Sequence, residues 1–184
     1  MQFPENERLG EILFTSAQLR ERVLELGAQI TKDYAGTSPL VVGVLKGSVL
    51  FLADLIRAID LPLQIDFMGT SSYGNSTKSS GVVRIVKDIE STLKDRHVIL
   101  VEDIVDTGLT LEYLLRVLKL REPASLKICS LLDKPSRRQA DVPVDYLGFS
   151  IPDHFVIGYG LDYANRYRNL DYIGTLELGP PPQA

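Results

Sequence analysis

The stretch that decides the fold is Val98-Ile99-Leu100-Val101-Glu102-Asp103-Ile104-Val105-Asp106-Thr107-Gly108-Leu109-Thr110. It opens with four apolar residues in succession, which are typical of a parallel strand covered on both faces. Three carboxylates follow within five residues, and a turn of small residues then leads into a helix expected over 111–121. Ligands of open α/β sheets bind outside the carboxyl ends of strands, where a helix N-terminus also offers free N–H groups. The stretch therefore predicts a polar ligand site at the end of a central strand.

The residues around this stretch alternate between helix and strand patterns. Apolar residues at helical spacing predict one helix from an N-cap at Ser16 to a terminating Gly36, and a second helix over 49–59. Apolar runs predict strands at 40–45, 63–67, 82–86, 97–101 and 126–132, followed by short strands at 144–147 and 155–158. This alternation indicates an α/β protein with a mostly parallel, twisted sheet flanked by helices.

Length and composition indicate a single globular domain. The chain has 184 residues, of which 45% are hydrophobic and 24% charged. Its net charge of −4 lacks the basic surplus usual in duplex-binding proteins, so no nucleic-acid partner is expected. No basic and apolar leader opens the chain and no apolar run approaches about 18 residues, so we expect a cytoplasmic protein with no membrane partner. Cys129 is the only cysteine, which excludes a disulfide framework and a thiolate zinc site.

A glycine- and serine-rich stretch at 69–81 interrupts the alternation of helices and strands. Long loops without secondary structure inside compact domains are usually functional segments or disorder. We expect a lid over the ligand site, with Gly69 and Gly81 as hinges, and a passive surface loop is the alternative.

The three carboxylates of the deciding stretch place a condition on the ligand. Thr107 and Thr110 can donate their hydroxyls, and Gly108 lets the backbone approach a phosphate closely. Acidic side chains beside a phosphate repel it unless they bind a divalent cation or hydroxyl groups, and a sugar phosphate with magnesium satisfies both conditions. The alternative is a solvated acidic turn with an ordinary helix cap, because Asp and Thr are common there for capping alone.

The whole pattern is similar to the 5-phosphoribosyl-1-pyrophosphate (PRPP) signature of the type I phosphoribosyltransferases. Four apolar residues, two acids, two apolar residues and then Asp-Thr-Gly-x-Thr make a specific match. The acid at Asp106 resembles the 6-oxopurine branch of the family, since adenine and orotate relatives have a small uncharged residue there. The resemblance continues in the family's order through a pyrophosphate loop at 44–48, a mobile loop at 72–75, and a purine hood at 131–138 and 151–163.

This resemblance implies a fold, a domain layout and a reaction. The expected fold is the type I phosphoribosyltransferase fold with a small hood made by the C-terminal and N-terminal segments. We expect a single domain over 1–184, with a core at about 16–132 and a hood at about 133–175 joined by the N-terminal segment. The expected reaction transfers phosphoribosyl from PRPP to hypoxanthine or guanine, giving IMP or GMP and pyrophosphate, with Mg²⁺ as cofactor.

The resemblance assigns roles to the acidic stretch. Glu102 and Asp103 are expected to bind the ribose 2′- and 3′-hydroxyls and to help orient a magnesium ion. Asp106 is expected to sit beside N7 of the purine and take its proton as the base attacks C1′. Residues 107–110 are expected to cradle the 5′-phosphate, although Leu109 stands where mammalian relatives have Lys.

Pyrophosphate and a second metal ion are assigned to other segments. Lys46 and Gly47 are expected to bind pyrophosphate, partly through backbone N–H groups in an unusual peptide geometry of the cis kind. Asp162 is expected to contact a second magnesium ion, and Arg168 the leaving pyrophosphate.

The hood and the mobile loop are expected to hold the base. Lys134 is expected to bond the 6-oxo oxygen and to reject adenine, because an ammonium has donors only. Phe155 is expected to stack on the purine, and the Val156 backbone to meet the ring's edge. Ser72 and Tyr73 belong to the loop expected to close over the site. Without the resemblance, Lys134 is an ordinary surface lysine and Phe155 an ordinary core residue.

Four charged or titratable residues receive no role from the resemblance. We interpret Arg84, Arg137 and Arg138 as solvated or interface charges. His154 stands where many relatives have Lys, and we interpret it as a partly exposed bystander.

Two other functions remain open at this stage. One is a phosphoribosyltransferase that prefers xanthine. The other is an RNA-binding regulator on the same fold, which should present a basic face that this acidic chain does not suggest. The resemblance also implies a homodimer or homotetramer.

Overall fold

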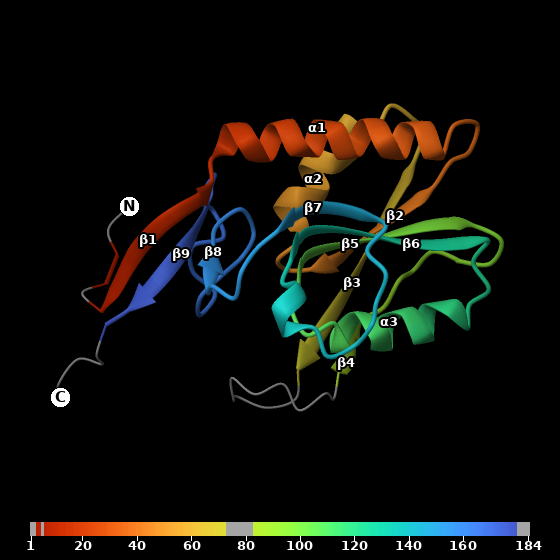
Figure 1. Cartoon of the computed structure of the whole chain (residues 1–184). Helices are drawn as coiled ribbons and strands as arrows, with labels where there is room; N and C mark the ends of the chain where they lie inside the picture. The colour runs from red at the N-terminus through yellow and green to blue at the C-terminus, as the bar shows by residue number, and fades with distance from the viewer. Residues whose placement is uncertain (1–2, 5, 73–82, 180–184) are drawn as a thin grey trace.

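The structure is a computed structural model that describes residues 3–4, 6–72 and 83–179. Its helices are α1 (Ser16–Asp33), α2 (Val49–Ala58) and α3 (Leu109–Lys119), with a short 3-10 helix at Pro135–Arg137. Its strands are β1 (Glu7–Phe14), β2 (Leu40–Leu45), β3 (Gln64–Ser72), β4 (Val83–Lys87), β5 (His97–Val105), β6 (Ser125–Asp133), β7 (Tyr146–Ser150), β8 (Val156–Ile157) and β9 (Ile173–Leu178). These strands form two sheets that lie next to each other (Figure 1).

The larger sheet has six strands in the order β4-β3-β2-β5-β6-β7. Every neighbouring pair is parallel except β3 and β4. The expected α/β class with a mostly parallel sheet is therefore confirmed. The chain moves from β2 outward to β3 and later from β5 outward to β6, so the strand order reverses between β2 and β5. The carboxyl ends of these two strands form the switch point at which ligands of such sheets bind.

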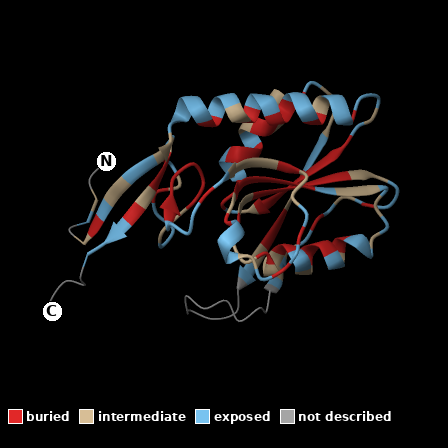
Figure 2. Cartoon of the chain, viewed as in Figure 1, coloured by how far each residue is buried: buried red, intermediate tan, exposed pale blue. Residues whose placement is uncertain are grey.

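Alternate residues of the central strands supply two separate apolar cores. Val41 and Ile99 pack with α1 and α2 on one face of the sheet. Val42 and Leu100 pack with α3 on the opposite face. This division follows from the period-2 alternation of side chains along a strand. Figure 2 shows the buried strands between the half-buried helices, so the central sheet is a rigid platform for whatever its ends carry.

The smaller sheet joins the two ends of the chain in the order β1-β9-β8. β9 pairs antiparallel with both neighbours. The sequence indicated only that the N-terminal segment joins the hood, and it did not predict β1 or β9 as strands. One reason is Glu7, which is buried where an apolar residue is usual, because Arg166 and the Tyr167 hydroxyl bond its carboxylate.

The expected helix boundaries were wrong by one or two residues. The N-cap of α1 is Thr15, not Ser16: the Thr15 hydroxyl accepts from the Gln18 N–H, and Gln18 Oε1 accepts from the Thr15 N–H at 2.9 Å. This is a capping box, which satisfies two backbone groups at once. Gly36 has a φ of +79°, as a helix-terminating glycine should, but it lies two residues beyond the C-cap.

Two strands extend further than the sequence indicated. β5 runs past residue 101 to Val105, so Glu102 and Asp103 are strand residues. β3 runs to Ser72, and Gly69 pairs with Lys87, so the expected hinge at Gly69 was wrong. The rest of the expected lid, including Tyr73 and Gly81, lies outside the described residues. Among the helices that the structure describes, none is both long and apolar enough to cross a membrane.

Candidate active site

The carboxyl ends of β2 and β5 bring the expected pyrophosphate loop against the acidic stretch. The two strands pair with each other up to Gly43 and Val101, and beyond these residues β2 continues beside β3 to Leu45 while β5 continues beside β6 to Val105. A Cβ on Gly47 would overlap Asp103 Oδ2. A side chain at this position would have to displace the Asp103 carboxylate, which lies directly against the loop backbone.

The loop after β2 has the unusual backbone that the resemblance implied. The Leu45–Lys46 peptide bond is cis, which confirms that expectation. Lys46 is exposed, whereas Ser48 is buried and its hydroxyl donates to the Val44 carbonyl at 2.7 Å. Ser48 thus anchors the loop to the end of β2, whereas Lys46 is exposed to solvent.

The protein by itself does not supply enough hydrogen-bond donors or positive charge for the carboxylates of Glu102 and Asp103. Glu102 is buried, and its Oε2 has no hydrogen-bond partner in the described part of the chain. Burial, reinforced by the charge of Asp103, raises the pKa of Glu102 well above its usual value. Burial also raises the pKa of Asp103 to about 6, against the opposing effect of backbone hydrogen bonds from Ile104 and from its own N–H. A cation or hydroxyl donors would supply the missing partners, so these two residues fit a bound magnesium ion and a ribose.

This raised pKa makes a prediction about stability in the absence of metal and substrate. The folded-state pKa of Asp103, about 6, exceeds its value in the unfolded chain, so stability falls as the pH rises through the interval between the two values and the loss is complete above pH 6. We expect Asp103→Asn to raise the free energy of unfolding at pH 8 by about 1–2 kcal/mol, a discounted figure for a half-buried group. The gain should shrink as the pH falls from 6 towards 4, where the wild-type carboxyl is protonated in both states.

Urea unfolding of the metal-free protein at pH 8 and pH 5 measures this effect. Asp88→Asn is the matched control, because the hydrogen bond from Arg121 lowers the pKa of Asp88. That variant should lose stability at pH 8 rather than gain it. A stability loss for Asp103→Asn at pH 8 would contradict the inference that the ionised Asp103 carboxylate destabilises the fold.

Asp162 and Arg168 lie beside the same loop. Arg168 Nη2 is 2.6 Å from Asp162 Oδ1, and Arg168 Nη1 donates to the Gly160 carbonyl at 2.7 Å. A Cβ on Gly160 would overlap the Gly47 carbonyl, so this segment abuts the pyrophosphate loop. Arg168 and Asp162 are also close enough to shift the pKa of Asp103 in opposite directions. The residues expected at the pyrophosphate end are therefore brought together, although the described residues contain no cluster of three or more His, Cys, Asp or Glu side chains suited to a metal.

The expected phosphate loop continues from β5 into α3. Gly108, at a φ of +81°, is the N-cap of α3, so the helix begins at Leu109 rather than at the expected residue 111. The Thr107 carbonyl accepts from the N–H groups of Gln139 and Ala140 at 2.9 and 3.1 Å, which fixes the loop against the segment after β6. The first turn of α3, which holds Thr110, is therefore presented at the same edge of the sheet as the carboxylates.

The residues expected around the base lie at the ends of β5 and β6. Val105 and Asp133 are paired across the two strands, which places Asp106 next to Lys134. Lys134 is only 7% exposed, and its Nζ lies 3.4 Å from Asp153 Oδ1. Lysines are rarely buried to this degree, so the reading of Lys134 as a surface lysine was wrong.

The remaining hood residues differ in exposure. Phe155 is 52% exposed, and its ring stands perpendicular to that of Tyr163 with the ring centroids 5.6 Å apart, so Phe155 is not a core residue. Val156 is buried in β8, and His154 is exposed. Ser72 ends β3 beside the undescribed segment that contains Tyr73.

Two arginines interpreted from the sequence as solvated or interface charges each bond a carboxylate. Arg137 Nε donates to Asp106 Oδ1 at 2.9 Å, and Arg138 Nε donates to Asp133 Oδ1 at 2.9 Å. Arg137 is exposed, as expected, whereas Arg138 is largely buried, so the interpretation as a solvated charge was wrong for Arg138. The only sequence signal was the position of both residues three or four places after Lys134, and spacing alone does not tell which way an exposed side chain points.

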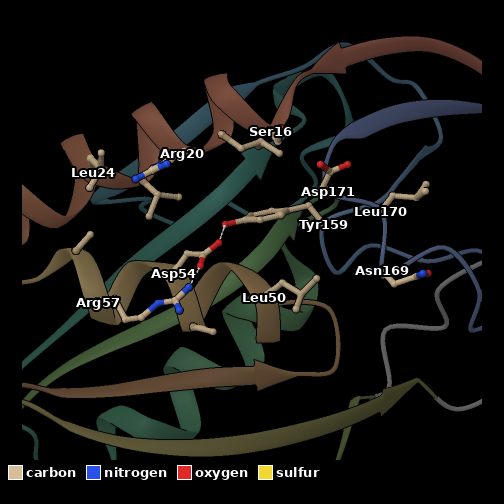
Figure 3. A pocket seen from close by; sticks show the side chains of 14 residues that line it. Ser16, Arg20, Leu24, Leu50, Asp54, Arg57, Tyr159, Asn169, Leu170 and Asp171 are labelled. Carbon is tan, nitrogen blue, oxygen red and sulfur yellow. Dashed lines mark hydrogen bonds and ion pairs between the residues drawn. The ribbon is translucent and has the colours of Figure 1, made fainter.

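A cavity of about 620 Å³ lies elsewhere, between α1, α2 and the segment 159–171 (Figure 3). Tyr159 crosses it, and the Tyr159 hydroxyl donates to Asp54 Oδ2 at 2.6 Å. The cavity is lined by none of the residues that the resemblance assigns to substrate or metal. Its volume therefore does not mark the candidate active site.

The loop at Gly47, the acids of β5 and the start of α3 meet at the switch point of the sheet, and this arrangement fits a phosphoribosyl transferase. Residues 12–164 match the family described as the phosphoribosyl transferase domain, so the chain belongs to this family. Individual relatives carry more specific names than the family. The chain is 53% identical over 169 residues to the hypoxanthine-guanine phosphoribosyltransferase of Bacillus subtilis, covering 92% of this chain and 94% of that protein. It is 54% identical over 171 residues to the hypoxanthine phosphoribosyltransferase of Haemophilus influenzae, covering 91% and 96%.

Solved structures give the same comparison. A hypoxanthine-guanine phosphoribosyltransferase from Bacillus anthracis, with a HEPES molecule in its active site, superposes with a TM-score of 0.88 at 47% identity. The superposition covers 91% of this chain and 99% of that one. The expected type I fold is therefore confirmed.

Proposed function

We propose that this protein is a purine-salvage enzyme that transfers the phosphoribosyl group of PRPP to hypoxanthine or guanine, giving IMP or GMP and pyrophosphate. The observation that carries the proposal is that an acid, Asp106, and a buried cationic donor, Lys134, directly follow the last paired residues of two adjacent strands, Val105 and Asp133. A 6-oxopurine presents a proton at N7 and an acceptor at its 6-position, and these two groups match that pair. The names of the relatives in B. subtilis and H. influenzae support the same substrates.

The proposed mechanism distributes the substrate over three groups of residues. Glu102 and Asp103 bind the ribose hydroxyls, residues 107–110 receive the 5′-phosphate, and the loop at Lys46 and Gly47 receives pyrophosphate together with Arg168. The reacting sugar then lies between the acidic stretch and the base, where its oxocarbenium-like transition state gains from nearby carboxylates.

The base is held on the opposite side of the sugar. Lys134 donates to the 6-oxo oxygen, Phe155 stacks on the ring, and the Val156 backbone meets its edge. Asp106 takes the N7 proton as the base attacks C1′, which increases the electron density of the ring at the moment of bond formation.

Magnesium is part of the proposal. Glu102 and Asp103 would hold one ion together with oxygens of PRPP, and Asp162 would contact a second ion, since Mg²⁺ is usually bound by one or two carboxylates and substrate phosphates. When bound, the metal neutralises charge on the departing pyrophosphate.

Removal of the metal should abolish activity. With excess chelator, we expect the rate of IMP formation to fall by more than about 10²-fold, because the loss of a charge-stabilising ion costs several kcal/mol. Manganese should restore much of the rate, since it prefers the same oxygen ligands. Initial rates in chelator, and after addition of Mg²⁺ or Mn²⁺ in excess, test this. Full activity in chelator would contradict the metal part of the proposal.

Product analysis tests the reaction itself. Incubation of the protein with PRPP, Mg²⁺ and hypoxanthine should give IMP and pyrophosphate in equal amounts, measured by liquid chromatography and phosphorus NMR. The reverse reaction, from IMP and pyrophosphate, should regenerate hypoxanthine. Release of ribose 5-phosphate without IMP would contradict transfer to a base.

Other features of the proposal rest on the family resemblance. They are a cytoplasmic location, a homodimer or homotetramer, a single domain over residues 1–184, and a hood that includes the N-terminal segment. Within 133–175, the range expected for the hood, β7 pairs with β6 in the six-stranded sheet. The later strands of this range, β8 from Val156 and the start of β9, belong to the three-stranded sheet. Neither the xanthine-preferring enzyme nor the RNA-binding regulator is favoured, because the relatives are named as hypoxanthine or hypoxanthine-guanine enzymes.

A further inference from the structure

Four charged side chains form a continuous chain across the proposed base site. Arg137 Nε donates to Asp106 Oδ1 at 2.9 Å, and Arg137 Nη1 lies 3.5 Å from Asp153 Oδ2. The other oxygen of Asp153 lies 3.4 Å from Lys134 Nζ. The acid proposed to take the N7 proton is thus connected to the lysine proposed to bond the 6-oxo oxygen.

The backbone directs Arg137 towards this chain. The short helix Pro135–Arg137 follows Lys134 directly, and the Arg137 N–H donates to the Lys134 carbonyl at 3.0 Å. The neighbouring Arg138 points elsewhere: it bonds Asp133 and the Val142 carbonyl and so anchors the segment that follows β6. The tight turn therefore directs Arg137 towards Asp106 and Asp153, and Arg138 towards the segment that follows β6.

Asp106 needs an external support. Its side chain is 42% exposed and follows the last residue of β5, so packing alone does not fix its orientation. Among the described residues, Arg137 is its only ion-pair partner, and the contact occupies one carboxylate oxygen. A guanidinium suits this task because its planar fork can donate to two carboxylates at once, which a lysine ammonium cannot do with the same geometry.

We propose that Arg137 is a positioning residue that orients the Asp106 carboxylate towards N7 of the purine, with Asp153 as its second anchor. The inference rests on the proposed function of Asp106. It extends that function to a residue that contacts neither PRPP nor the reacting atoms.

Arg137→Gln is the first test. Glutamine removes the charge and ends where arginine has Nε, so it keeps a neutral donor near Asp106 but loses the branch that reaches Asp153, and Arg137 is 46% exposed, so the fold should be retained. We expect kcat for IMP formation to fall by about 10- to 100-fold, the usual cost of a misplaced reacting group. KM for PRPP should stay within about twofold, because the sugar and phosphate groups are bound elsewhere. Arg137→Lys should regain part of the lost turnover, since its ammonium can pair with one carboxylate but not bridge two.

A double-mutant cycle distinguishes positioning from a general structural role. If Arg137 acts through Asp106, Arg137→Gln should change kcat by less than about threefold in an Asp106→Asn background. Two independent effects would multiply instead.

The matched control is Arg121→Gln. Arg121 also bonds an exposed aspartate, Asp88, at 2.8 Å, but it follows the C-terminal end of α3, whereas the candidate site lies at the N-terminal end of that helix. Its turnover should stay near that of the wild type. Wild-type kcat in Arg137→Gln, or multiplying effects in the cycle, would overturn the positioning role and leave the proposed function intact. A wild-type protein that forms no IMP would overturn both.

Discussion

Asp106→Asn is expected to lower kcat for IMP formation by about 10²–10⁴-fold, the usual contribution of a general acid–base group. Asparagine keeps the shape of the side chain and can still accept from Arg137 Nε through its amide oxygen. It removes the negative charge that draws the N7 proton, so the loss should fall on the chemical step. KM for PRPP should change little, because Glu102, Asp103 and the loop at 107–110 are untouched.

Single-turnover measurements with PRPP, Mg²⁺ and hypoxanthine isolate this step from product release. Asp88→Asn serves as the control, since Asp88 is another exposed aspartate bonded by an arginine. Its rate should match that of the wild type. A near wild-type single-turnover rate for Asp106→Asn would show that Asp106 acts only as a polar residue at the start of α3.

Lys134→Gln is expected to have its main effect on the choice of base. The wild-type ammonium has three donors and no acceptor, so it bonds a 6-oxo group and leaves a 6-amino group without a partner. Sites of this type discriminate by up to about 10⁴–10⁵-fold. A glutamine amide can donate or accept after a flip, so the variant should bind hypoxanthine more weakly and lose most of the discrimination against adenine.

The ratio of kcat/KM for adenine and hypoxanthine, measured on both proteins, gives the result directly. Lys127→Gln is the matched control: Lys127 lies on β6 and, like Lys134, contacts an aspartate, in its case Asp145 at 2.7 Å. Its base preference should be that of the wild type. If Lys134→Gln leaves both values of kcat/KM unchanged, Lys134 does not recognise the 6-position.

The fold class could be predicted because its signal is local and repeated. The apolar runs at 40–45 and 97–101 lie at the centre of the sheet, and alternate residues in each run pack on opposite faces. Boundaries were less predictable, since they depend on single contacts. β5 continues through Glu102, which pairs with Ser130 of β6 and is buried, and no propensity of Glu for strands indicates this.

The candidate site was predictable where a motif fixes the spacing and unpredictable where only tertiary structure does. The acidic stretch and Lys134 were found because the motif names them. Arg137 was missed because its task depends on a turn that points it at Asp106, thirty-one positions earlier in the chain. The burial of Glu7 by Arg166 and Tyr167 was equally invisible, since these residues come from opposite ends of the chain.

The most direct test of the proposed function is a steady-state comparison of four purines with the wild-type protein, PRPP and Mg²⁺. Hypoxanthine and guanine should be converted to their monophosphates with kcat/KM values at least about 10⁴-fold above that of adenine. Xanthine should fall below both if the relatives' names describe this chain as well. Adenine turned over as readily as hypoxanthine would contradict the assignment of Lys134 and Asp106 to a 6-oxopurine, and turnover of none of the four bases would contradict the transferase itself.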